Sequence, residues 1–230
     1  MGNLAGAAAF FLAIHLLVSG TRVRDVLTAR IGENAYMGLF SLASVAGIVW
    51  LSSAYGPAAR SAANPVWWGV TPAARHIQIL LQLAAVILVT GGLLTRNPTS
   101  VRQEGALERP DVVQGFLRVT RHPFLWGVAL WAAGHLLVNG DGASLVLFGS
   151  ILVLALAGTA SIDAKRRRKL GQAWDGFAGA TSNIPFAAVL AGRQKLDLRE
   201  IGLVRPGLGL LLWAALLMGH GHIFGVPALG

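Results

Sequence analysis

The sequence predicts an all-α fold, a polytopic membrane helix bundle with about six transmembrane helices. Only 13% of the 230 residues are charged, about half the fraction that soluble domains carry. Mean hydropathy is correspondingly high, at +0.61. The apolar residues gather in blocks of about 16 to 20, the length needed to cross the hydrocarbon core of a bilayer. Basic residues fall in alternate connections between these blocks.

The expected spans follow one another at residues 4–20, 35–55, 77–95, 123–138, 143–162 and 206–224. The first has no basic residues before it, which indicates a span rather than a cleaved signal peptide. The fourth and fifth are joined by Asn139-Gly140-Asp141-Gly142. Asn and Gly tolerate the left-handed conformation that ends a helix, and Asp141 can cap the next one. These two spans should therefore form an antiparallel hairpin.

The distribution of Lys and Arg predicts the orientation. Segments 21–34, 96–121 and 163–205 hold all of the 19 basic residues except Arg60 and Arg75. By the positive-inside rule these three segments are cytoplasmic loops, and both termini are periplasmic. We therefore expect one transmembrane domain over residues 1–230, as a multi-pass protein of a bacterial inner (cytoplasmic) membrane.

Composition also excludes several classes of site and partner. The absence of cysteine excludes disulfides, thiolate metal sites, iron–sulfur clusters and cysteine nucleophiles. The formal charge of +9 does not indicate nucleic-acid binding, because no basic stripe with interleaved aromatic residues occurs in a soluble segment. The expected partners are the lipid bilayer and a lipid-soluble small-molecule substrate. No feature indicates an oligomeric state.

Ionisable residues inside a membrane span are costly and therefore mark functional sites. Only histidines lie within the expected spans or near their ends: His15, His76, His122, His135, His220 and His222. No Asp or Glu lies well inside a span, which argues against a proton pump or cation transporter. Neutral imidazole is a common ligand of haem iron. Without cysteine, a haem with two histidine ligands is the metal site that these residues suit best.

The depths of the histidines restrict the pairing without deciding it. At 1.5 Å per residue, His15 lies roughly 17 Å below the outer edge of its span and His135 roughly 6 Å below. His76 lies near the outer edge, as do His220 and His222, and is an alternative partner for His135. Trp131, His135 and Asn139 recur every four residues and share one helix face. That face offers an aromatic wall, a ligand and a polar cap.

A second candidate site lies on the expected cytoplasmic side. Arg121-His122-Pro123 opens a span with proline in its first turn, and the N–H groups of such an end accept anions. Asp163 and the basic run at 165–169 lie at the base of the same hairpin. The run itself is typical of an anchor against anionic lipid. Arg121, His122 and Asp163 form the second candidate site.

Several motifs resemble those of the NnrU family, over about residues 5 to 195. They are His15 with Ser19, Gly32-Glu33 before Phe40-Ser41, Arg121-His122-Pro123-Phe124-Leu125-Trp126-Gly127, Leu130-Trp131, His135-Leu136 with Asn139-Gly140, Thr181-Ser182 with Ile184-Pro185-Phe186, and Gly192-Arg193. The family is named for an association with nitrite and nitric oxide reduction. It is also similar to the plant 15-cis-zeta-carotene isomerase, a membrane enzyme of carotenoid biosynthesis that uses haem b.

This resemblance implies that His15 and His135 are the axial ligands of a haem b, and that His122 belongs to the isomerase's Arg-His-Pro motif. Other histidines expected of the isomerase fall here near Ser53 and Leu154. The fourth-to-fifth hairpin also resembles the signature of isoprenylcysteine carboxyl methyltransferases and phospholipid methyltransferases. Leu125 stands where that signature has tyrosine, and Ile162-Asp163 where it has two acids. The second resemblance implies S-adenosylmethionine as an alternative cofactor, near Arg121, His122 and Asp163.

Three functions follow from these patterns. The first is a haem-b membrane protein, either an isomerase of a lipid-soluble polyene or a redox protein linked to nitrogen-oxide metabolism. The second is a membrane methyltransferase that depends on S-adenosylmethionine. The third is a non-enzymatic factor for nitrite or nitric oxide respiration (denitrification). The first, as a haem-dependent isomerase-like enzyme, is the favoured interpretation.

Overall fold

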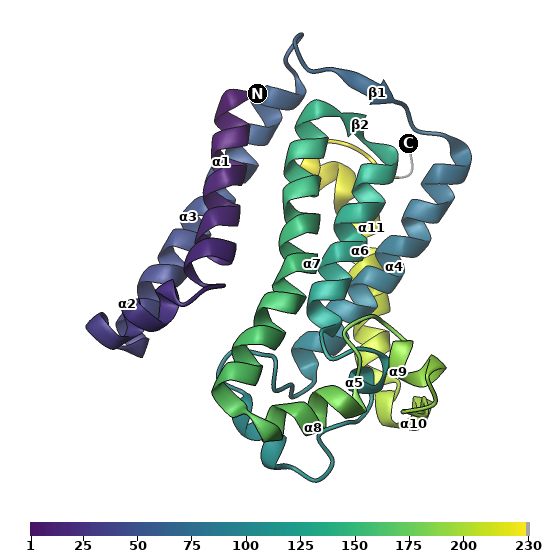
Figure 1. Cartoon of the computed structure of the whole chain (residues 1–230). Coiled ribbons are helices and arrows are strands. Elements are labelled where there is room, and N and C mark those ends of the chain that lie inside the picture. Colours follow the sequence, from purple (N-terminus) through teal and green to yellow (C-terminus); the bar gives the residue numbers. More distant parts are fainter. Residues whose placement is uncertain (229–230) are drawn as a thin grey trace. The chain divides into compact units, whose positions relative to one another are not determined.

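A computed structural model describes residues 1–228 of the chain, and 74% of it is helical (Figure 1). The chain forms two compact units. Unit 1 comprises Met1–Gln78 and Ala132–Lys165, and unit 2 comprises Ile79–Trp131 and Arg166–Gly230. Three helices, α4, α6 and α7, contribute residues to both units.

Unit 1 begins with α1 (Gly2–Ala13), the π-helix η1 (Ile14–Val18), α2 (Val23–Ile31), α3 (Glu33–Ala59), strand β1 (Val66–Trp68) and the start of α4 (Pro72–Leu94). It continues with the end of α6 (Pro123–Val138), strand β2 (Gly140–Asp141) and most of α7 (Gly142–Leu170). Helix α1 runs alongside α3 (Figure 1).

The core of unit 1 is a cluster of small and apolar side chains. Helix α1 contributes Leu4, Ala7, Ala8 and Phe11, a spacing that places them on one helix face. The remaining members are Leu51, Ala54 and Ala58 of α3 and Ala143 of α7. Small residues allow the helix backbones to approach closely, which is the usual basis of helix association where lipid surrounds the protein.

The turn between α6 and α7 is fixed by polar contacts. Asp141 accepts hydrogen bonds from the backbone N–H of Ser144 at 3.1 Å and from its hydroxyl at 2.6 Å, so Asp141 caps α7 as the sequence predicts. The Asn64 amide donates to Asp141 at 2.9 Å. Strand β1 pairs with β2, with Trp68 opposite Gly140. A Cβ at Gly140 would lie 2.3 Å from the Trp68 carbonyl oxygen, so the pairing requires glycine there.

Unit 2 holds the rest of α4, the 3-10 helix η2 (Glu104–Glu108), α5 (Phe116–Val119), the start of α6 and the end of α7. It continues with α8 (Gln172–Ala180), α9 (Ala187–Leu190), α10 (Leu198–Ile201) and α11 (Val204–Phe224). The short helices belong to the segments expected to be loops. Helices α5, α8, α9 and α10 gather at one end of this unit (Figure 1).

Helices α4, α6 and α11 pack closely within unit 2. A Cβ added at Gly127 of α6 would lie 2.7 Å from the Ala85 carbonyl oxygen of α4. One added at Gly209 of α11 would lie 3.0 Å from the Ile87 Cα. Glycine is therefore required at both crossings. A separate apolar cluster of Leu117, Trp174 and Phe177 joins α5 to α8.

The structure confirms a nearly all-α fold with helices long and apolar enough to cross a membrane. Within residues 1–228, four helices meet that description: α3, α4, α7 and α11. The segment Gly2–Val18 with Val23–Ile31 makes a fifth if it is one span, bent by 78° at its break. Helix α6 is apolar but has only 16 residues. The count of six spans, the periplasmic termini and the single transmembrane domain stay predictions.

Candidate functional site

His15 lies in a π-helical turn of unit 1. The Ser19 N–H donates to the Ile14 carbonyl at 3.0 Å, five residues back, where an α-helix would bond four residues back. π-helical turns are rare and occur frequently at functional sites. The Nδ1 of His15 is 2.8 Å from the Phe11 carbonyl oxygen, so Nδ1 carries the proton. This leaves Nε2 as the ring nitrogen that can bind a metal or substrate, the orientation typical of metal-ligating histidines.

Aromatic rings surround the His15 imidazole. The Phe11 ring of α1 lies 4.5 Å away and the Phe40 ring of α3 lies 5.1 Å away in an edge-on arrangement. Phe40 in turn stacks on Tyr36 at 5.9 Å, and the Arg24 guanidinium lies over the Tyr36 ring. The half-buried imidazole therefore lies in an apolar, aromatic environment formed by two helices.

His135 lies near the end of α6 and is also half-buried. Its ring stacks on Phe148 of α7, with 4.6 Å between ring centroids and 17° between the planes. Phe148 meets Tyr55 of α3 edge-on at 6.2 Å, and the Tyr55 hydroxyl is 3.0 Å from the Ser144 hydroxyl. The orientation of the His135 ring thus depends on residues of α3 and α7.

Contacts with α7 give the relative depth of the two histidines. Phe148 marks the level of His135, and Ser161 marks the level of Gly20, because its hydroxyl is 3.5 Å from the Gly20 carbonyl oxygen. Roughly 20 Å of helix separates these two α7 residues. His15 lies one turn before Gly20, so it lies roughly 13 Å from the level of His135 along α7. Both histidines belong to unit 1, at different depths.

The remaining residues of the first candidate site, Asn139, Trp131 and His76, do not gather around one histidine. The Asn139 amide donates to the His135 carbonyl oxygen at 2.8 Å and so closes the last turn of α6. Trp131 belongs to unit 2, where its carbonyl accepts a hydrogen bond from Gln82 at 3.1 Å. His76, the alternative ligand, is exposed, and its Nδ1 bonds the Pro72 carbonyl at 2.7 Å. Of the histidines predicted to bind haem, His15 and His135 are therefore half-buried, whereas His76 is exposed.

The Arg-His-Pro motif of the second candidate site lies in a buried polar layer of unit 2. The Arg121 N–H donates to the Ser182 carbonyl at 2.9 Å, and the Arg121 carbonyl accepts from the Asn97 amide at 2.9 Å. The Thr120 hydroxyl donates to the Asn183 carbonyl, and Thr120 is 0% exposed. These bonds join three segments that are distant in the sequence. The motif backbone therefore holds the loops together.

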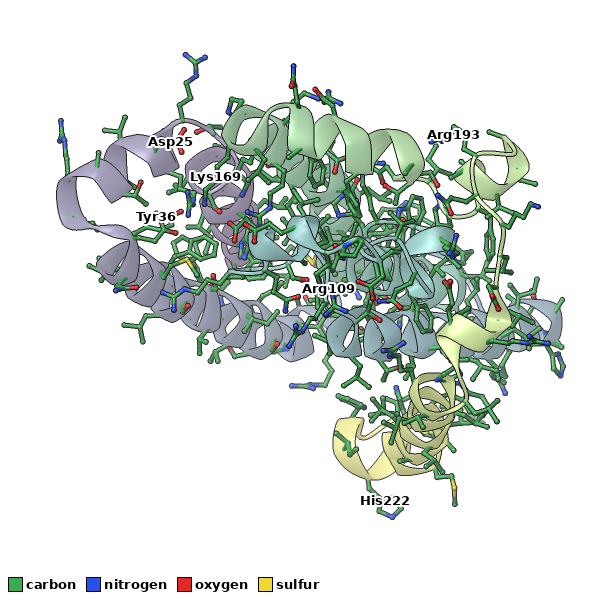
Figure 2. The ribbon with its side chains drawn as sticks, turned by 90° about the horizontal axis from the view of Figure 1, so that it is seen from below. Asp25, Tyr36, Arg109, Lys169, Arg193 and His222 are labelled. Carbon is green, nitrogen blue, oxygen red and sulfur yellow. The ribbon has the colours of Figure 1, made fainter. Side chains whose placement is uncertain are left out.

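The motifs near residues 181–193 complete this layer. The Phe186 N–H donates to the Val119 carbonyl at 2.7 Å. Arg193, labelled in Figure 2, donates to the carbonyls of Gly179 and Thr181 at the end of α8. The last carbonyls of a helix lack hydrogen-bond donors within it, and Arg193 provides such donors at the end of α8. These residues, which belong to the motifs that resemble the NnrU family, therefore stabilise the fold.

The structure does not bring the three predicted residues of the second site into one unit. Arg121 and His122 belong to unit 2, where His122 is 2% exposed, and Asp163 belongs to unit 1. The neighbouring basic run contacts the loop before α5, since Arg166 and Lys169 both pair with Glu104. Burial acts to raise the pKa of Glu104, but a backbone hydrogen bond and Arg166 outweigh it and lower the pKa to about 2. Part of the run is thus engaged within the protein.

Sequence reasoning missed the aromatic partners of the histidines. Phe11 had a detectable signal, because it precedes His15 by four residues and must share its helix face. Phe40 and Phe148 had none, because they reach the histidines from other helices. The π-helical turn also lacked a signal, since its residues are ordinary helix-forming apolar types.

Comparison with known proteins identifies relatives along the chain. The NnrU protein family matches residues 3–228, nearly the whole chain. The chloroplastic 15-cis-zeta-carotene isomerase of Zea mays is 33% identical over 82 residues, and that of Arabidopsis thaliana is 32% identical over 82 residues. Each match covers 36% of this chain and 22% of the relative's length. No solved structure matches. The match over residues 3–228 establishes that the chain belongs to the NnrU protein family.

Proposed function

We propose that this protein is a haem-b membrane protein with isomerase-like activity on a lipid-soluble polyene. Family membership and the partial similarity to zeta-carotene isomerases support the reaction class. The observation that carries the proposal is the state of His15. Its Nδ1 is bonded to the Phe11 carbonyl, its Nε2 remains for a ligand, and it belongs to the same unit as His135.

Unit 1 contains side chains of the kinds that hold a haem. Among residues 1–228, no group of three or more His, Cys, Asp or Glu side chains gathers in a way that could hold a metal ion. A site with two histidine ligands needs no such group. The rings of Phe11, Phe40 and Phe148 supply apolar surfaces of the kind that pack against a planar macrocycle. His15 and His135 would hold the haem, and because they lie at different depths, their rings must approach each other when it binds.

When bound, haem b would supply an iron centre that eases rotation about a conjugated double bond. The protein's own residues hold the ligands in place. The π-helical turn and the Phe11 carbonyl orient His15, and Phe148 and Asn139 hold the end of α6 that carries His135. In unit 2, Trp131 lines an apolar cavity of about 180 Å³ together with Val89 and Leu212.

The same proposal includes the membrane arrangement. The six apolar helices cross a bacterial inner membrane, with both termini periplasmic and the basic segments cytoplasmic. Helix α6 measures about 24 Å, less than the roughly 30 Å of the hydrocarbon core. Its capped turn into α7 would let the bilayer thin locally at that end. We do not propose S-adenosylmethionine as the cofactor, because the Arg121 backbone and the buried His122 belong to the loop packing.

The absorption spectrum of the protein purified from haem-replete cells tests the proposal. We expect a Soret band that His15→Ala and His135→Ala each abolish or shift, because each substitution removes one of the residues that would hold the haem. His76→Ala is the matched control and should keep the band. Size-exclusion profiles of all three variants separate loss of haem from loss of folding. A colourless wild-type protein, or an unchanged band in both the His15 and His135 variants, would contradict the assignment.

The activity itself needs a second measurement. Detergent-solubilised wild-type protein is incubated with 15-cis-zeta-carotene, and the isomers are separated by chromatography. We expect conversion that His135→Ala abolishes and His76→Ala retains. A haem-containing protein without conversion would leave the cofactor assignment standing and reject the isomerase activity.

A further inference from the structure

Unit 2 contains a cavity of about 300 Å³ lined largely by polar and basic residues. Its arginines come from three places in the sequence: Arg96 just after α4, Arg109 just after η2 and Arg205 in the first turn of α11. Thr95 and Gln114 also line it. Figure 2 is seen from the side on which the loops of unit 2 lie, and Arg109 is labelled there.

The positive charge of this cavity is only partly neutralised. Arg109 forms an ion pair with Asp111 at 3.0 Å. Arg205 donates to the Glu200 backbone carbonyl at 3.4 Å, while the Glu200 carboxylate is bound by Arg118. The side chain of Arg96 forms no hydrogen bond or ion pair with any of residues 1–228. No carboxylate lines the cavity, so it carries an excess of positive charge.

A buried hydroxyl adds a second, independent sign of a ligand. Thr95 is 7% exposed, and its hydroxyl has no hydrogen-bond partner within residues 1–228. Buried polar groups are nearly always bonded, because an unbonded one costs on the order of 1–3 kcal/mol. Thr95 and Arg96 both line the cavity.

The position of the cavity restricts the chemical class of its ligand. Leu94 ends α4 and Arg205 begins α11, so the cavity lies where two long apolar helices end. In a membrane this is the depth of lipid headgroups, where arginines meet phosphate. Arginine binds phosphate through paired, charge-assisted hydrogen bonds. A role in membrane orientation alone requires basic loops and does not require three guanidinium groups around one cavity.

We propose that this cavity binds a phosphate group, with Arg96 and Arg205 as the principal contacts. The phosphate belongs either to the headgroup of an anionic lipid or to a small soluble phosphate ester. The residues of this site belong to unit 2, and the proposed haem ligands belong to unit 1.

The first arm of the test measures lipid. The full-length protein is placed in nanodiscs of phosphatidylcholine with phosphatidylglycerol, and retained lipids are counted by native mass spectrometry. The second arm titrates glycerol 3-phosphate into the protein in neutral detergent by calorimetry. Binding in either arm supports the site and identifies the source of the phosphate.

Variants decide whether the cavity is responsible. We expect Arg96→Gln and Arg205→Gln each to weaken binding about tenfold, the effect of losing one charge-assisted bond. Arg60→Gln is the matched control, an exposed arginine outside the basic segments that does not line the cavity, and it should leave binding unchanged. Melting temperatures confirm that the variants fold. The proposal fails if neither arm shows binding, or if Arg60→Gln weakens binding as much as Arg96→Gln.

Discussion

In unit 1 the tertiary polar contacts gather near the ends of the helices, as with Asn64, Asp141 and Ser144 beside the α6–α7 turn. In unit 2, a layer of buried polar residues lies beneath the loops and includes Thr120 and Ser182. The helices of unit 1 otherwise associate through alanine, leucine and aromatic side chains. Polar side chains therefore stabilise the ends of helices in unit 1 and connect loop segments in unit 2.

This difference separates two kinds of residue within the family motifs. Residues near 118–123 and 181–193 form hydrogen bonds between segments, and their positions explain the loop packing. His15, in contrast, bonds only its own helix through Nδ1 and contacts other elements through aromatic rings. A motif residue that holds no other segment by hydrogen bonds is the better candidate for a ligand.

The largest effect should come from the apolar centre of the loops in unit 2. Trp174 is 0% exposed and packs against Phe177 and Leu117. We expect Trp174→Ala to lower the free energy of unfolding by about 3–5 kcal/mol, because the cavity left behind cannot collapse fully. Thermal unfolding in detergent measures it. Trp67→Ala, at a residue 58% exposed, should change stability by less than about 0.5 kcal/mol. If Trp174→Ala lowers the free energy of unfolding no more than Trp67→Ala does, the polar layer alone stabilises the loops.

An intermediate effect should come from the polar turn of unit 1. We expect Asp141→Ala to cost about 1–2 kcal/mol, because it removes the cap of α7 and the bond from Asn64. Asp141→Asn retains an acceptor for the Ser144 N–H and should cost less. Hydrogen exchange of residues 139–145 follows the local change. Unchanged protection in Asp141→Ala would mean that apolar packing fixes this turn.

The smallest effect should be a pH dependence in unit 2. The pKa of Glu104 falls from its ordinary 4.5 to about 2, so the ionised carboxylate stabilises the folded state above pH 4.5. That stability is lost as the pH falls from about 5 to about 2. We expect Glu104→Gln to cost about 1 kcal/mol at neutral pH, typical of a solvent-screened pair, and to flatten this acid dependence. Denaturant titrations at several pH values measure it.

Glu108→Gln, an exposed change on the same short helix, is the control for Glu104 and should leave the acid dependence intact. A remaining slope in Glu104→Gln is expected from Glu200. A hydrogen bond from Arg118 lowers the pKa of that carboxylate as well. If Glu104→Gln and wild type lose stability in parallel, Glu104 contributes no pH-dependent stability.

Much of the fold follows from sequence periodicity and capping. Segment 35–55 lies within α3 and 143–162 within α7, and Asp141 caps α7 as its position predicts. Apolar runs specify such helices locally, so a single sequence is sufficient. Strand β1 could not be predicted, because it exists only by pairing with β2, more than 70 residues later.

The candidate sites were less accessible to sequence reasoning. The histidines could be named as ionisable groups within apolar segments. Their aromatic neighbours, however, depend on how helices pack. The arginines of the cavity were counted as markers of orientation. Only the folded chain shows that Arg96, Arg109 and Arg205 line one cavity. The distribution of Lys and Arg predicts which side of the membrane a loop occupies, whereas the tertiary contacts show which arginines line a cavity.

The π-helical turn at Ile14–Val18 has a consequence for how this helix can change. A π-turn contains one residue more than an α-turn, so deleting a single residue there would convert it to ordinary α-helix. Because the wide turn accommodates the extra residue locally, the helix before and after it would keep its register, and only side chains within the turn, His15 among them, would change direction. Length variation of one residue, rather than substitution, is thus the mutation that would re-aim His15 while leaving its imidazole intact.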